Sequence, residues 1–373
     1  MSTSPDSTSP SSLERIASGA SWNDFCDVLK RAGATILADN APDDPLDQAE
    51  GFRYLSRLTR AALEVFVEHA DPRAPVLHRP VHETAKIGAD NPDNHYQNAA
   101  ISGQYEYRIW GTRGTVHYLG FGTQAGNYGS TGRSGPTGYL ESADLEIESD
   151  GSFEILVSCE KKPGNWLPME PDTETLIVRQ TRLDHQREEL AQFTIERIGD
   201  DTTPSPATPE AIDRGLTASS NLVVGCAALF ANWADGFRKH TNQLPEFDQG
   251  VSLAAGGDPH ICYYHSYWEL EPEQALLIEV MPPECEYWNF QLNNHWMESL
   301  DYRFHRVAIN KHQAHYGEDG SLCVVVAHRD PGLPNWIETA GHRHGTMCFR
   351  WVRAAAHPQP HTRVVELSDL SNR

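Results

Sequence analysis

The chain has 373 residues, which favours two domains over one, and 39% of them are hydrophobic, enough to build a core rather than a disordered chain. The formal net charge is −22 and no cluster of Lys or Arg exceeds two residues, which argues against nucleic acid or an anionic membrane as a partner. No apolar run approaches the roughly 20 residues that span a bilayer, and seven cysteines without a C-x-x-C pair suit reduced thiols in a cytoplasmic protein.

The first elements are expected to be helical. Residues 1–11 are polar and lack the basic and apolar regions of a secretory signal, so they are predicted to be a disordered tail. Apolar residues recur at helical spacing in 12–36 and again in 48–70, which indicates a helical pair within an N-terminal region of 12–100. That region ends in GADNPDNHYQNA (88–99), whose side chains either face a pocket or, as we prefer, form an Asx-rich turn before the first strands. The polar residues of this segment are Asp90, Asn91, Asp93, Asn94, His95 and Tyr96.

Between residues 101 and 199 the hydrophobic period becomes two, which predicts a domain rich in β-hairpins. One hairpin is expected to turn at 111–114 and a second at 150–151, with further strands to follow. The segment 120–138 has a glycine every two to four residues, so it is predicted to be a mobile flap over a binding site, unable to pack in a core.

The second half of the chain begins after a linker. The Pro- and Thr-rich 200–209 is the linker candidate, and apolar residues at helical spacing predict a long helix over 209–241. Strand patterns over 242–356 are typical of a sandwich or jelly roll, and 357–373 are expected to be a poorly structured tail. The predicted fold is mainly β with helices (α+β): β-sandwich or jelly-roll-like modules, preceded by the helical pair and linked by the long helix.

The segment YWNFQLNNHW, at 287–296, alternates aromatic residues with amides. With the period of a strand, Trp288, Phe290, Leu292 and Trp296 share one face, which belongs in a core. The other face carries amides and an imidazole, groups suited to a ligand with hydroxyls or carbonyls, although a solvated outer face is the alternative. The residues predicted to bind substrate on this face are Tyr287, Asn289, Gln291, Asn293 and His295.

The segment GHRHGTMCFRW, at 341–351, divides in the same way. His342, His344, Thr346, Cys348 and Arg350 share its polar face, and we expect the polar faces of the two segments to border one cavity. His344 and Arg350 are further candidate substrate-binding residues. The His-x-His pattern also suggests a metal site, but no Glu follows at a ligand spacing and 18 histidines make chance pairs common, so no metal is predicted.

The predicted buried strand SLCVVVA is followed by His328 and Asp330, which come just before a Pro-Gly turn. A carboxylate beside an imidazole at a pocket rim would form an acid–base pair, so Asp330, His328 and His342 are the candidate catalytic residues. The alternative is that Asp330 only caps the turn. Nucleophile-elbow, phosphate-loop and dinucleotide motifs are absent from the sequence, so no cofactor is predicted.

These C-terminal motifs resemble a known family. YWNFQLNNHWMESLDY, followed by VVVAHRDPGLPNWIETAGHRHGTMCFRW, is similar to the bacterial domain-of-unknown-function family twelve-fourteen over about 255–354. GADNPDNHYQNAAISGQYEYRIWGTRGT is similar to the start of a second unknown domain, twelve-fifty-four, which members often carry upstream. The resemblance implies β-sandwich modules with a jelly-roll-like C-terminal part, and it implies no reaction.

Three functions fit these features. The first is a soluble, cofactor-independent hydrolase or lyase for a small, hydroxyl- or ring-rich substrate such as a glycoside, terpenoid or steroid. The second is a non-catalytic β-sandwich protein that binds carbohydrate or another ligand, and the third is a structural or assembly protein whose aromatic residues are all core. An enclosed pocket with a carboxylate of shifted pKa favours the enzyme, an open aromatic shelf favours binding, and a surface without a concavity favours the structural role.

Overall fold

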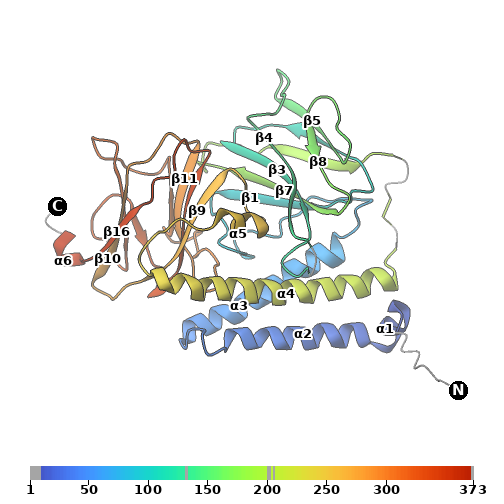
Figure 1. Ribbon diagram of the computed structural model, residues 1–373, viewed down its shortest axis with the longest axis horizontal. Coiled ribbons are helices and arrows are strands. Elements are labelled where there is room, and N and C mark those ends of the chain that lie inside the picture. The colour runs from blue at the N-terminus through green and yellow to red at the C-terminus, as the bar shows by residue number, and fades with distance from the viewer. Residues whose placement is uncertain (1–9, 131–132, 200–202, 205, 371–373) are drawn as a thin grey trace.

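The computed structural model describes residues 10–130, 133–199, 203–204 and 206–370, so most of the expected tail at 1–11 lies outside the described residues. The described chain has two β modules side by side on a layer of helices (Figure 1). This arrangement confirms the predicted class, mainly β with helices and a long helix between the modules. The helices are α1 (Ser12–Ser18), α2 (Ala20–Ile36), α3 (Pro45–Leu63), the π-helical η1 (Glu64–Glu68), α4 (Pro209–Phe237), the short 3-10 helix η2 (Arg238–His240), α5 (Gln249–Ala254) and α6 (Leu367–Leu370).

The long helices begin at capping residues. The side chain of Asp44 accepts the N–H groups of Leu46 and Asp47 at the start of α3, and Thr208 accepts the N–H of Ala211 at the start of α4. A proline occupies the first turn of both helices, where its missing N–H would have no intrahelical acceptor. These local signals explain why the two helices start where the sequence predicted helical patterns.

Helix α4 is the structural link between the layers. It packs against α2 and α3 on one side and reaches β9 and β15 on the other. Together with η2 it is long and apolar enough to cross a membrane by length and composition alone, contrary to the expectation that no run is long enough. The buried central helix of a globular protein passes the same test, and half of the most apolar stretch is buried against the rest of the chain.

The first β module consists of two four-stranded sheets with a shared core. One sheet has the order β1-β7-β3-β4 and the other β6-β5-β2-β8. Ile109, Phe121, Ile155 and Val178 are fully buried between them. The strands are β1 (Asn94–Ala100), β2 (Tyr107–Thr112), β3 (Tyr118–Ala125), β4 (Gly135–Glu141), β5 (Ser152–Ser158), β6 (Trp166–Pro168), β7 (Thr173–Thr181) and β8 (Gln192–Arg197).

Three expectations for this half of the chain were wrong. The N-terminal region is not helical up to residue 100, because β1 pairs along its whole length with β7. No hairpin turns at 111–114, because β2 pairs with β5 and β8 in one sheet whereas β3 pairs with β4 and β7 in the other. At 150–151 the chain does turn, but only β5 follows and residues 142–149 form no strand.

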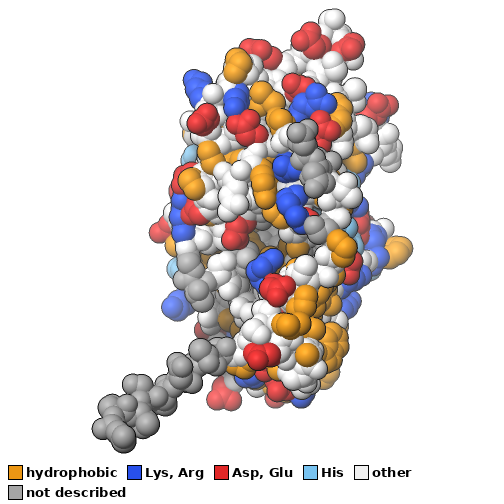
Figure 2. All heavy atoms as spheres, turned by 90° about the vertical axis from the view of Figure 1, so that its right-hand side faces the viewer, with side chains coloured by type: hydrophobic (Ala, Val, Ile, Leu, Met, Phe, Trp, Pro, Cys, Tyr) orange, Lys and Arg blue, Asp and Glu red, His pale blue; other side chains and the backbone are white. Residues whose placement is uncertain are grey.

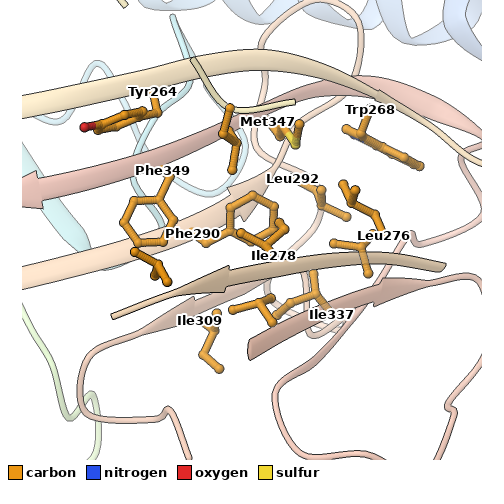
Figure 3. Close-up of a cluster of buried hydrophobic side chains, with 14 of the residues drawn as sticks. Tyr264, Trp268, Leu276, Ile278, Phe290, Leu292, Ile309, Ile337, Met347 and Phe349 are labelled. Carbon is orange, nitrogen blue, oxygen red and sulfur yellow. The ribbon is translucent and has the colours of Figure 1, made fainter. Parts of the chain in front are cut away.

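The second β module is a sandwich of two four-stranded sheets, ordered β12-β11-β15-β9 and β14-β13-β10-β16. Its core contains the apolar faces of β9, β11 and β15, which pack on the facing sheet as Figure 3 shows for Tyr264, Phe290 and Phe349. The expected tail at 357–373 contains strand β16, which pairs with β10. The strands are β9 (Ile261–Glu269), β10 (Gln274–Val280), β11 (Tyr287–Leu292), β12 (Ala308–Asn310), β13 (Leu322–Ala327), β14 (Trp336–Glu338), β15 (His344–Val352) and β16 (His361–Glu366).

Candidate functional site

A cavity of about 1030 Å³ lies where the helices meet both β modules. Its walls come from η1 and α4, from the segment 87–105 with β1, from β3 and β7 of the first module, and from β9 and β15 of the second. Figure 2 shows the end of the molecule nearest this region, where the surface is hollowed near its middle and charged side chains of both signs lie around the hollow. The site is therefore built by segments far apart in the sequence.

One wall of the cavity is apolar and aromatic. Helix α4 contributes Leu222, Phe230 and Trp233 to this apolar lining. Phe66 of η1 and Ile177 of β7 also belong to it. Phe230 packs edge-on against Trp233, with ring centroids 5.6 Å apart, in the cluster that joins α4 to the second module. Such a wall suits the apolar or ring-containing body of a small molecule.

Two arginines from different modules also line the cavity, Arg350 of β15 and Arg179 of β7. Arg350 is 4% exposed, and its guanidinium lies over the ring of Tyr263, 5.8 Å from the centroid. Burial raises the pKa of Tyr263 to about 12 and also raises the pKa of Tyr96. The positive charges of both arginines act against burial and lower the pKa of each tyrosine. They therefore act on one common end of the cavity.

The amides of β11 hold Arg350 from behind. Its Nη1 donates to Gln291 Oε1 at 2.6 Å and to Asn289 Oδ1 at 3.3 Å, and Asn289 lies directly opposite Arg350 in the sheet. Gln291 Nε2 in turn donates to Asn293 Oδ1 at 2.6 Å and to the backbone oxygen of Asp90 at 2.8 Å. The amides form a continuous buried network, and none of the three lines the cavity.

A turn at residues 88–93 covers this network. Ala89 has a φ of 57°, which a residue with a side chain adopts only at a cost, and its backbone oxygen accepts a hydrogen bond from Arg350 Nη2. Asn91 caps the turn by accepting the N–H of Asp93 at 3.0 Å, and its Nδ2 donates to the hydroxyl of Tyr287 at 3.1 Å. The preferred interpretation of 88–99 as an Asx turn is thus confirmed, and several of its side chains also line the cavity. These are Asp90, Asn91, Asn94 and Tyr96.

The two polar faces were predicted to border one cavity, but only one residue of the two faces, Arg350, lines it. Both faces lie on the same side of the sheet, as the pairing of Gln291 with Cys348 and of Asn289 with Arg350 requires. Arg350 alone of the seven predicted substrate-binding residues lines the cavity. Tyr287, Asn289, Gln291 and Asn293 lie behind it, because the 88–93 turn fills the space in front of them.

The two histidines of 341–351 contact helix α3 instead, and His295 of 287–296 contacts β9. His342 Nε2 lies 2.9 Å from Glu50 Oε2, and His344 Nε2 lies 2.8 Å from Asp47 Oδ2. His295 Nδ1 is 3.2 Å from the hydroxyl of Tyr267, and burial lowers the pKa of His295 to about 3. His342 and His344 connect the second module to the helical layer, and His295 lies within the second module. The structure therefore gives no support to His342 as a catalytic group or to His295 and His344 as ligand contacts.

The predicted acid–base pair of Asp330 and His328 is not formed. Asp330 is exposed and accepts the N–H of Gly332 at 2.8 Å, which is the turn cap of the alternative interpretation. His328 places Nδ1 2.8 Å from Thr339 Oγ1 and Nε2 3.1 Å from the oxygen of Leu270, so both ring nitrogens are engaged. Neither residue lines the cavity.

The glycine-rich segment 120–138 is not a separate flap. Its ends are strands β3 and β4, and residues 131–132 lie outside the described part of the chain. The tip borders the cavity through Gly126, Asn127, Tyr128 and Ser130 and packs on α4. A Cβ on Gly129 would lie 2.5 Å from the α4 backbone at residues 221–222, so the glycines allow close packing rather than prevent it.

Sequence reasoning missed Arg179, Tyr263 and the α4 wall. The available signal was Arg179 directly after the apolar run LIV in the strand TLIVRQT, because a cation next to a core-forming run needs a reason to be there. Within the described ranges, no group of three or more His, Cys, Asp or Glu residues could hold a metal ion.

Comparisons with known proteins place this geometry in context. Residues 273–356 match the family model described as Protein of unknown function (DUF1214), while the resemblance of the upstream segment to a second unknown domain stays a prediction. The crystal structure of an uncharacterized protein from Burkholderia cenocepacia is 53% identical, with a TM-score of 0.94, and the match covers 95% of this chain and 99% of that one. The VPA0106 protein of Vibrio parahaemolyticus is 11% identical over 84% of this chain and 98% of its own, with a TM-score of 0.48, too low to support an argument. No curated protein matches the chain.

Proposed function

The chain belongs to the same family as the uncharacterized Burkholderia cenocepacia protein, with which it shares its whole fold, and we propose that it binds a small organic molecule in the cavity. The observation that carries this proposal is the cavity itself, whose volume of about 1030 Å³ is at the upper end of the about 300–1,000 Å³ typical of ligand pockets. Its lining combines apolar and aromatic side chains with polar and charged groups that can orient a ligand. A purely structural role would not require a space of this size between the modules, since interiors are otherwise close-packed.

A neutral fluorescent probe tests the proposal directly. N-phenyl-1-naphthylamine emits strongly when its rings leave water, and we expect it to bind the purified protein with a stoichiometry of one. Ala218 lies on α4 and lines the cavity, so Ala218→Trp should fill the space and abolish probe binding. Thr217 precedes it on the same helix but is exposed and does not line the cavity, so Thr217→Trp is the matched control. Probe emission that is absent, or equal in both variants, would contradict the proposal.

An enzymatic role is the second candidate, and Asp90 is the observation that favours it. Asp90 lines the cavity and is 4% exposed, and its carboxyl accepts hydrogen bonds from the backbone N–H and the hydroxyl of Ser299. Burial raises the pKa of Asp90 above its ordinary value, although Lys86 and Ser299 act in the opposite direction. A buried carboxyl with a raised pKa near a bound molecule suits the role of a general acid, and a hydrolase or lyase needs such a group.

This second candidate has a separate test. Once turnover of any cavity ligand is measured, Asp90→Asn should lower kcat by about a hundredfold or more while leaving ligand affinity nearly unchanged. Asn keeps one oxygen to accept the Ser299 N–H, so the 88–93 turn should still form. A variant that binds and turns over as the parent does would leave binding as the whole function.

A further inference from the structure

We infer that the molecule bound in the cavity is an organic anion whose acidic group is held by Arg350 and Arg179. This inference rests on the proposed function and names the class of ligand. It follows from how the protein pairs its charges. Among the described residues, neither arginine has a carboxylate within 4.0 Å, whereas Arg57, for example, lies 2.6 Å from Glu298.

Arg350 is buried with neutral partners only. Among the described residues, its acceptors are the side-chain amides of Asn289 and Gln291 and the backbone oxygen of Ala89. A guanidinium has five N–H donors, so two of them, on Nε and Nη2, have no acceptor in the described chain. Neutral acceptors fix the orientation of the group without cancelling its charge. A buried cation left in this state is stabilised by a bound anion.

In the described part of the chain, Arg179 has fewer hydrogen-bond acceptors than Arg350. Its one hydrogen bond within the described residues runs from Nη2 to the oxygen of Gly256, at 2.8 Å. Asp258 is the nearby acid that raises the pKa of Arg179, but its carboxylate is occupied elsewhere. Oδ2 accepts the hydroxyls of Tyr139 at 2.6 Å and of Tyr118 at 3.1 Å, and Oδ1 accepts the N–H of His260. Most of the Arg179 donors therefore remain for a ligand.

The remaining groups at this end of the cavity are also compatible with an anion. The hydroxyl oxygens of Tyr96 and Tyr263 accept backbone N–H groups, at 3.0 and 3.3 Å, which leaves each hydroxyl proton available to a ligand oxygen. Burial lowers the pKa of His265 to about 3, so its ring is neutral. Both oxygens of the Asp90 carboxyl accept hydrogen bonds from Ser299, and among the described residues no ion pair joins Asp90 to Arg350.

The ligand must also have an apolar body, because part of the cavity that the arginines line is bordered by apolar side chains. Leu222, Phe230 and Ile177 border that part and offer no hydrogen bonds from their side chains. A carboxylate, sulfonate or sulfate attached to rings or to an alkyl chain satisfies both parts. A small inorganic anion would leave the apolar wall unoccupied.

A matched pair of probes separates this inference from the proposed function. 8-Anilino-1-naphthalenesulfonate carries the same rings as N-phenyl-1-naphthylamine and adds one sulfonate. We expect the sulfonate probe to bind at least about tenfold more tightly than the neutral one, since each charge-assisted hydrogen bond adds to affinity. Arg350→Met and Arg179→Met should each bring the ratio of the two affinities close to one, and Arg350→Lys should retain part of the preference. Arg343→Met, at an exposed arginine paired with Glu271 outside the cavity, is the control and should leave the ratio unchanged.

The outcomes are distinct. Equal affinity for the two probes in the parent protein, or a sulfonate preference that both methionine variants keep, overturns the inference while the cavity remains a binding site. Failure of both probes to bind, or binding that Ala218→Trp leaves intact, overturns the proposed function and the inference together. If Arg350→Met does not fold, Arg179→Met alone decides, because Arg179 is half-buried and loses only one hydrogen bond.

Discussion

The contact between the β3–β4 tip and helix α4 predicts opposite effects for two substitutions of the same kind in one helix. Gly225 lies in α4 where a Cβ would meet the backbone oxygen of Tyr128 at 1.9 Å. Gly236 lies in the same helix, and a Cβ there would meet nothing within 4 Å. Changing each to alanine adds one methyl group and raises helix propensity by up to about 1 kcal/mol.

The distances set the expected size of the difference. Ordinary van der Waals contact begins at 3.4 Å, so the β3–β4 tip must move by about 1.5 Å (3.4 − 1.9) to admit the methyl group of Gly225→Ala. Overpacking costs about 1–3 kcal/mol, and a clash with backbone belongs at the upper end of that range. After the gain in propensity, Gly225→Ala should lose about 2 kcal/mol, and Gly236→Ala should gain up to about 1 kcal/mol.

Urea unfolding followed by tryptophan fluorescence measures both variants against the parent protein, provided that the slope of the transition is unchanged. Because Tyr128 lines the cavity, Gly225→Ala should also weaken binding of N-phenyl-1-naphthylamine, which Gly236→Ala should not. A Gly225→Ala protein as stable as the parent would show that the tip does not pack on α4 as described, and the reasoning from glycine contacts would fail.

Three other predictions concern single side chains. Burial alone would lower the pKa of His342, but the hydrogen bond and charge of Glu50 raise it overall above 6.5. The contribution of the His342–Glu50 pair to folding stability is therefore complete below pH 6.5 and is lost as the pH rises through the raised pKa. The difference in urea midpoint between the parent and His342→Gln should therefore shrink from about pH 6 to about pH 9, and a constant difference would contradict this. Asp330→Asn should change the free energy of unfolding by less than about 0.5 kcal/mol and leave probe affinity unchanged, because Asn also caps the turn; a large loss of stability would contradict the turn-cap role, and a large loss of probe affinity would show that Asp330 acts on the cavity. Gln291→Leu should cost about 2–3 kcal/mol in urea unfolding and weaken the sulfonate probe, because it removes an acceptor from buried Arg350, and an unchanged protein would show that the amide network is dispensable.

From the sequence we predicted correctly which side chains of a strand face the core, but not which strands pair with each other, and the difference has a physical reason. The period of two in 287–293 assigns side chains to two sides of a strand by geometry alone, and Trp288, Phe290 and Leu292 are indeed in the sandwich core. Which strands pair depends on contacts between distant segments. The short connection between β2 and β3 has the glycines of a hairpin turn, yet each strand continues in a different sheet.

The site was predicted in part for the same reason. Arg350 was identified because its own strand shows the alternation of polar and apolar residues. The 88–93 turn that covers the amides, and the α4 wall, come from elsewhere in the chain, and no local pattern shows that they meet β11 and β15. Asp330 and His328 were plausible because a strand end is a common place for catalytic groups, but a turn cap produces the same sequence signal.

The alternation of amides and aromatics in β11 follows from two demands on one strand. One face must be apolar because it packs in the sandwich core, and the other must hold a buried cation. A carboxylate in place of Gln291 would neutralise Arg350 and remove the positive charge that the proposed anion needs, whereas an apolar residue would leave guanidinium donors unpaired. A chain with a formal net charge of −22 repels an anion at long range, so recognition must come from short-range contacts inside the cavity, where solvent ions screen little. Neutral amides meet these requirements, because they orient the guanidinium and leave its charge to the ligand.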